Sequence, residues 1–145
     1  MKRTGIIQLI ISSLLIALFV YTGTSKLLDH TNFEFALSRF PLLSPVYVLL
    51  SWFIPIAELG IGILLFFKRS RLTGFFLSLI TMIIFTVYLV YAYWLSGNRP
   101  CTCGGILRNL SWPVHIAINL FFAFISFSGI VINKRKTAMT GRAPP

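Results

Sequence analysis

The chain has 145 residues, of which 57% are hydrophobic and 11% are charged, and its formal net charge is +10. Soluble domains carry about 25% charged residues and hide too little surface to bury so many apolar side chains, so the composition excludes an ordinary soluble fold. The basic residues flank apolar segments, a distribution that indicates membrane orientation and argues against a nucleic-acid partner.

Four apolar segments each approach the roughly 20 residues that cross a bilayer. Backbone polar groups need internal partners in hydrocarbon, so these segments are predicted to be helices. No A-x-A cleavage site follows the first, and we expect it to be retained. The chain is predicted to be all-α, a four-transmembrane-helix bundle in a single integral membrane domain, residues 1–145. The expected helices are residues 6–28, 46–67, 72–95 and 114–133, with a basic cytoplasmic tail at 134–145.

The charges predict an orientation for this bundle. Four basic residues fall on the side of the first and third connections, where Asp29 and Glu34 offset them. The positive-inside rule therefore places both termini in the cytoplasm and the other face outside. Nine basic residues fall on the side of the termini: Lys2, Arg3, Lys68, Arg69, Arg71, Lys134, Arg135, Lys136 and Arg142.

The connection between the first two helices, residues 30–45, has a helical pattern of its own. Phe33, Leu37 and Phe40 are spaced as on one helical face, and Phe35 falls off that face. We expect a short amphipathic helix at the outer interface, stopped by Pro41. A plain connecting loop is the alternative.

Glu58 lies near the middle of the second predicted helix, about 18 Å from its start at 1.5 Å per residue. A carboxylate at that depth costs at least ~2.5 kcal/mol, so it should face the bundle interior with a partner or be protonated. A proton relay and a polar contact to a quinone-like ligand are the functional interpretations, and an interhelical hydrogen bond is the structural one. Close helix packing is expected at Ala57, Gly60 and Gly62.

Candidate partners for Glu58 are few. Lys26 closes the first helix and can extend inward or outward. His115 and Asn119 are four residues apart on the fourth helix and share a face. One hypothesis is that these two residues form a polar connection from the outer loop toward Glu58. The alternatives are that His115 is an interfacial histidine and that Asn119 only forms a hydrogen bond between helices.

Both cysteines of the chain, Cys101 and Cys103, lie in the short polar stretch before the fourth helix. The predicted orientation puts them on the outer face, which in bacteria is an oxidising compartment. A C-x-C disulfide closes a small ring, and strained, exposed disulfides tend to be labile and oxidising. Arg99 and Arg108 would favour the reactive thiolate.

Three interpretations of this pair remain open. The first is thiol–disulfide exchange with a partner protein, with Cys101 attacking and Cys103 resolving. The second is a loop staple or two packed side chains. The third is a metal site, for which only His30 and His115 could complete the four ligands that zinc prefers; no metal is expected.

Four features together resemble the methylamine-utilisation MauE family, within the DoxX-like group of four-helix membrane proteins. They are the GTSKLLD run at residues 23–29, the P-x-x-E-x-x-x-G pattern from Pro55 to Gly62, the CTCGG loop from Cys101, and Trp112 with Asn119 seven residues later. The resemblance implies a bacterial inner-membrane protein linked to disulfide formation in a periplasmic or membrane partner. Carried over by position, Lys26, Glu58, Cys101 and Cys103 are its matching residues.

The layout is also similar to quinone-linked thiol oxidoreductases of the DsbB and vitamin K epoxide reductase types. Those proteins generally use two cysteine pairs, whereas this chain has one C-x-C, so a complete relay to a quinone would need a second pair from a partner. We therefore expect a membrane protein that takes part in thiol–disulfide exchange or in maturation of an extracytoplasmic partner, with a quinone as the candidate cofactor. A non-catalytic docking subunit and a proton or quinone site at Glu58 are the rival hypotheses.

Overall fold

The computed structural model of the chain describes residues 2–39, 43–96 and 112–140, and these form five helices and no strand. Four of the helices are long and apolar enough to cross a membrane. This confirms the predicted all-α bundle of four membrane helices with one short helix between the first two. The helices are α1 (Lys2–Leu28), α2 (His30–Ser38), α3 (Tyr47–Phe66), α4 (Arg71–Ser96) and α5 (Trp112–Thr140).

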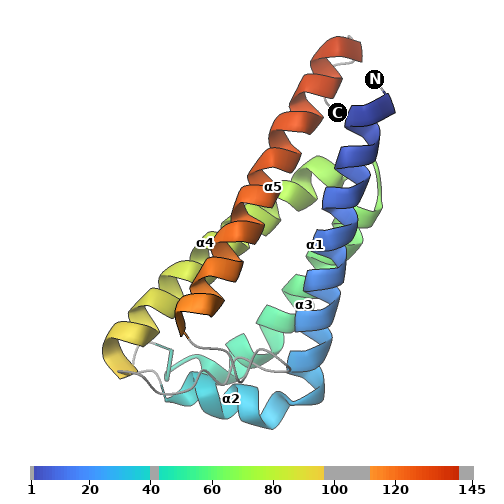
Figure 1. The fold of residues 1–145 in the computed structure, drawn as a ribbon. Helices are drawn as coiled ribbons and strands as arrows, with labels where there is room; N and C mark the ends of the chain where they lie inside the picture. The colour runs from blue at the N-terminus through green and yellow to red at the C-terminus, as the bar shows by residue number, and fades with distance from the viewer. Residues whose placement is uncertain (1, 40–42, 97–111, 141–145) are drawn as a thin grey trace.

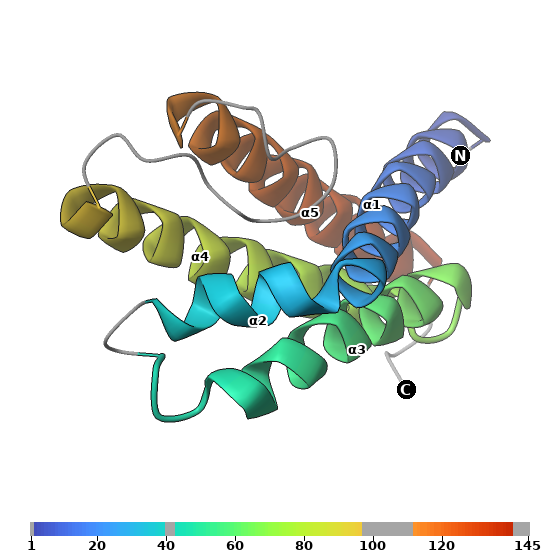
Figure 2. The ribbon, with the colours of Figure 1, turned by 90° about the horizontal axis from the view of Figure 1, so that it is seen from below.

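The long helices form two closely packed pairs. α1 packs mainly against α3, and α4 packs mainly against α5. The start of α1, the turn from α3 to α4 and the last turns of α5 lie together at the top of Figure 1, here called the termini end. α2, the end of α4 and the start of α5 lie at the opposite end, here called the α2 end (Figures 1 and 2).

The core lies between the two pairs, toward the termini end. It is a cluster of seven buried apolar side chains, to which all four long helices contribute. Large apolar side chains cover the outer surface, as lipid requires, with Leu49 70% and Phe124 69% exposed. The buried cluster consists of Leu15, Phe19, Ile61, Leu65, Phe75, Met82 and Ile130.

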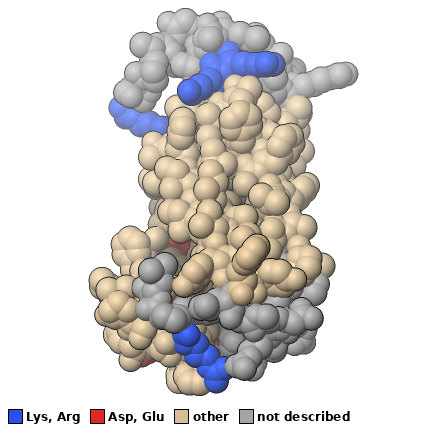
Figure 3. Space-filling model, turned by 90° about the vertical axis from the view of Figure 1, so that its left-hand side faces the viewer, with Lys and Arg blue, Asp and Glu red and all other residues tan. Residues whose placement is uncertain are grey.

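Basic side chains mark the two ends of the face shown in Figure 3. Blue side chains lie at the top and bottom of this face, tan surface lies between them, and small red acidic patches lie in its lower half. Among the described side chains, Lys68, Arg69, Arg71, Lys134 and Arg135 belong to the termini end, and Arg39 belongs to the α2 end.

α2 confirms the amphipathic helix expected in the first connection. Phe33 and Leu37 are buried and Phe35 is 56% exposed, as the spacing predicts. The helix runs from the end of α1 along the start of α3 (Figure 2). It ends at Ser38, three residues before Pro41, because a proline disfavours helical backbone in the residue preceding it. The predicted face residue Phe40 lies outside the described residues.

The last helix is longer than its apolar segment. The apolar span is Pro113–Arg135, close to the expected residues 114–133, and α5 continues through the basic stretch to Thr140, since lysine and arginine are good helix formers. One expectation about packing is wrong. Gly60 is not a packing position, since a Cβ added there would meet nothing within 4 Å. Gly62 does pack, with Val20 Cγ2 3.4 Å from the corresponding point.

Candidate functional site: a buried ion pair at the α2 end

The most unusual feature of the bundle is an ion pair buried between α1 and α3. Lys26 is 6% exposed and Glu58 is 2% exposed. The Lys26 ammonium donates a hydrogen bond to Glu58 Oε1. The burial and the partner expected for Glu58 are thus both present, and Lys26 turns inward instead of extending to the surface.

Local sequence brings these two side chains together. A Cβ on Gly23 would lie 3.1 Å from the carbonyl oxygen of Pro55 and 3.1 Å from Leu59 Cγ, so glycine allows α1 to approach α3 closely here. Lys26 and Glu58 each follow this contact by three residues on helices that run in opposite directions. Helical side chains lean toward their own N-terminus, so the two lean toward each other.

The Lys26 ammonium contacts aromatic rings on α4 and α2 as well. It lies 4.6 Å from the centre of the Phe85 ring on α4 and 5.6 Å from that of Phe33 on α2. His115 on α5 is also buried, three residues after the start of its helix at the same end of the bundle. Lys26, Phe33, Glu58, Phe85 and His115, one residue from each helix, are called the five-helix polar site below.

Two atoms of this site lack partners. Glu58 Oε2 and His115 Nδ1 are buried, and neither has a hydrogen-bond partner among the described residues. The Thr22 hydroxyl, one turn before Lys26, lies near the Glu58 carboxylate and donates a hydrogen bond to the Phe19 carbonyl oxygen at 3.4 Å. Leaving a buried polar atom unpaired costs about 1–3 kcal/mol, so both atoms need an explanation.

The burial of this ion pair within a membrane bundle indicates a functional role more than a stabilising one. A buried ion pair is weak evidence for stability, because desolvation consumes most of its Coulomb energy. Ionisable groups inside a membrane bundle instead mark ion, proton or ligand sites by default. Lys26, Glu58 and His115 offer three groups that can hold a proton, and the Phe33 and Phe85 rings favour a cation between them.

Asn119 and His30 are not part of the site. Asn119 is half-buried one turn after His115, and no contact of its side chain with the site is described. His30 stacks on Trp52 with ring centres 4.3 Å apart, and its Nδ1 lies 3.6 Å from Glu34 Oε2. Within the described ranges, no three His, Cys, Asp or Glu side chains gather as metal ligands would.

Cys101 and Cys103 lie outside the described residues. The helices on either side of them are described, however. α4 ends at Ser96 and α5 begins at Trp112, and both of these ends lie at the α2 end of the bundle. The chain segment that carries the cysteines therefore begins and ends on the same side as the five-helix polar site.

Sequence reasoning missed Thr22, Phe33 and Phe85 as neighbours of the ion pair. Thr22 had a signal, since it lies one helical turn before Lys26 on the same face. Phe33 was assigned to the buried face of α2, but its partner was unknown. Phe85 is one of 14 phenylalanines, and nothing in its spacing distinguishes it.

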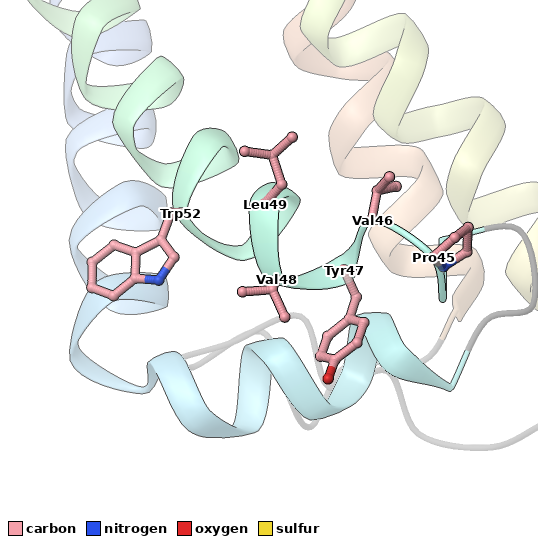
Figure 4. A pocket seen from close by; sticks show the side chains of 6 residues that line it. All are labelled: Pro45, Val46, Tyr47, Val48, Leu49 and Trp52. Atoms are coloured by element: carbon pink, nitrogen blue, oxygen red, sulfur yellow. The ribbon is translucent and has the colours of Figure 1, made fainter.

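A hollow of about 550 Å³ lies at the start of α3, away from this ion pair. In Figure 4, Val46 and Leu49 point to one side of the helix start while Tyr47 and Val48 point toward α2. The lining is apolar apart from the Tyr47 and Trp52 polar tips, and it brings no reactive groups together. Its lining residues are Pro45, Val46, Tyr47, Val48, Leu49 and Trp52.

A family model described as "Methylamine utilisation protein MauE" matches residues 4–132, a range that includes the whole five-helix polar site and both cysteines. No curated protein and no solved structure matches the chain significantly.

Proposed function

Because the chain belongs to the MauE family, we propose that it is a bacterial inner-membrane protein that supports methylamine utilisation by thiol–disulfide exchange with an extracytoplasmic partner. Cys101 and Cys103 are the exchanging pair in this proposal. Both termini would face the cytoplasm, since the basic residues at the termini end fit the positive-inside rule.

One observation carries the proposal. The segment with both thiols joins α4 to α5 at the end of the bundle that holds Lys26, Glu58 and His115. Cys103 is nine residues before Trp112, so the chain spans at most about 30 Å between them. The segment therefore begins and ends at the α2 end of the bundle, and the proposal places its thiol chemistry on that side of the membrane.

The exchange balances as follows. A thiolate of the partner attacks one sulfur of the Cys101–Cys103 disulfide, forming a mixed disulfide and releasing the other sulfur as a thiolate. A second partner thiolate then breaks the mixed disulfide. The partner gains a disulfide and loses two electrons and two protons, and the chain's pair becomes a dithiol.

Reoxidation of the dithiol needs an acceptor, for which we propose the class of lipid-soluble quinones. A quinone accepts two electrons and two protons and dissolves in the bilayer.

Trapping of the mixed disulfide tests the proposal. Cys101→Ser and Cys103→Ser are each expressed in intact cells whose own copy is deleted, then quenched with acid and resolved without reductant. Exchange is reversible, so the single remaining thiolate can attack the partner's disulfide, forming a mixed disulfide and releasing one partner thiolate. One of the two single variants should accumulate this larger, reductant-sensitive adduct, because the chain's second thiol, which would release the partner, is missing. The Cys101→Ser/Cys103→Ser chain, which has no cysteine, is the matched control.

The same strains separate exchange from docking. Growth on methylamine and the disulfide state of the partner should fail in both single variants if the pair exchanges electrons. If both variants grow normally and neither forms an adduct, the chain is a docking subunit and the exchange proposal is wrong.

A further inference from the structure

We propose that the five-helix polar site binds an exchangeable proton and exchanges it with the α2 end only, remaining closed toward the termini end. This inference does not depend on the cysteines. It rests on the two unpartnered buried atoms and on the position of the apolar core along each helix.

The two unpartnered atoms indicate where the proton enters. Glu58 Oε2 can accept a hydrogen bond, and His115 Nδ1 can accept or donate one. A water molecule or a proton could satisfy either atom, and a buried water is held by two to four polar partners. His115 is three residues after the start of α5, about 4.5 Å along the helix from the α2 end.

The balance of charge in the site suits a proton that comes and goes. α1 contributes the Lys26 ammonium, α3 the Glu58 carboxylate and α5 the His115 imidazole. The groups that α2 and α4 turn toward the ammonium are the uncharged rings of Phe33 and Phe85. A proton added to Glu58 or His115 leaves one net positive charge, which both rings stabilise.

The nearest titratable pair on α2 belongs to a different contact. His30 and Glu34 lie against each other, and the His30 ring stacks on Trp52. His30 Nε2 is also buried without a described partner, but its ring belongs to the packing of α2 on α3. Tyr88, three residues after Phe85 on α4, is partly buried and has an interaction of its own. Proton exchange at the site is assigned to Lys26, Glu58 and His115.

Toward the termini end the site is closed by the buried apolar cluster. On α1 the cluster residue nearest to Lys26 is Phe19, seven positions before it, and on α3 the nearest to Glu58 is Ile61. Met82 precedes Phe85 on α4, and Ile130 follows His115 on α5. On every membrane helix the cluster thus lies between the site and the termini end.

The buried hydroxyls in this half do not form a path through the cluster. Ser12 and Ser78 each donate to a carbonyl of their own helix, four residues earlier, at 2.8 Å. Ser126 Oγ has no partner in the described part of the chain, but it lies roughly 16 Å along α5 from His115. A single hydroxyl at that separation cannot carry a proton between them.

Infrared spectroscopy of the full-length protein in lipid tests proton binding. The C=O stretch of a protonated carboxyl group should appear as external pH is lowered, and it should shift when D₂O replaces H₂O. Glu58→Gln should abolish this band. Glu34→Gln, which removes a carboxylate at the surface of α2, should leave it intact. No band assignable to Glu58 at any pH where the protein stays folded would overturn proton binding.

The route and its closure are tested separately. His115→Phe should slow the H/D shift of the Glu58 band by about 100-fold, the contribution of one positioned proton-transfer group; an unchanged rate would overturn the assigned route. In liposomes with an imposed pH gradient, wild-type protein should leak no faster than protein-free lipid. A leak that Glu58→Gln abolishes would mean that the site is open to both sides and would overturn the closure.

Discussion

Removing one member of the Lys26–Glu58 pair should destabilise the protein in a way that depends on which member is removed. In Lys26→Met, Glu58 remains buried without its cation and must take up a proton on folding. Neutralising a glutamate at pH 7 costs about 4 kcal/mol. In Glu58→Gln, Lys26 must lose a proton, which costs about 5 kcal/mol. Both values match the roughly 3–5 kcal/mol expected when a buried pair is broken.

The pH dependence gives this prediction its sign. Folded Lys26→Met binds one more proton than its unfolded state, so its stability should fall by about 1.4 kcal/mol for each unit of rising pH. Folded Glu58→Gln binds one proton fewer, so its stability should rise with pH by the same amount. Lys26→Met/Glu58→Gln carries no ion, and we expect it to lie within about 1 kcal/mol of wild type with no slope.

Unfolding by SDS in lipid–detergent bicelles, followed by tryptophan fluorescence at pH 6, 7 and 8, measures all four proteins. Equal slopes for the two single variants would refute the reasoning, and so would a double variant whose loss equals the sum of the single losses. A Glu58→Gln protein with wild-type stability at every pH would mean that Lys26 escapes to water, in which case the pair does not hold the bundle together.

Two further perturbations test the packing of the helices. Gly129→Ala places a Cβ 2.7 Å from Phe75 Cε1 and should lower the free energy of unfolding by about 1–3 kcal/mol in the same assay. In Gly60→Ala the added Cβ meets nothing within 4 Å, and helix propensity should raise the free energy of unfolding by up to about 1 kcal/mol. Equal effects of the two variants would contradict the packing of α4 on α5. Phe33→Ala should speed amide hydrogen exchange throughout α2, because it removes one of the two buried apolar side chains of that helix. The control Phe35→Ala changes an exposed side chain and should leave the exchange rates unchanged. If the α2 amides stay protected in Phe33→Ala, Leu37 alone holds the helix in place.

The sequence was sufficient for the membrane helices and for the burial of Glu58, because both follow from free energies of transfer. It was not sufficient to choose the partner of Glu58. Lys26, His115 and Asn119 all remained open, since hydrophobicity fixes which segments cross the membrane but not how each helix is rotated about its axis. The close contact of Gly23 with Pro55 determines that Lys26 is the partner of Glu58, and this contact cannot be read from either helix alone.

The same limit explains the pair on α5. His115 and Asn119 share a helical face, yet His115 is buried and Asn119 is only half-buried. Asn119 is one turn farther toward the termini end, where Phe122 and Ala123 pack against the apolar cluster. Sequence spacing can place two residues on one face of a helix. It cannot show which of them lies level with the polar groups of the neighbouring helices.

The separation of Lys26 and Glu58 along the chain has a consequence for biosynthesis. Lys26 leaves the ribosome 32 residues before Glu58, which at 5–20 residues per second corresponds to roughly 2–6 s without its partner. A lysine in the last turn of a helix tolerates this delay, because its long stem carries the ammonium to the headgroups. A glutamate in the middle of a helix has a shorter side chain that cannot reach the headgroups. Synthesis in this order delivers the cation first, so the carboxylate enters the bilayer beside a helix that can already neutralise it.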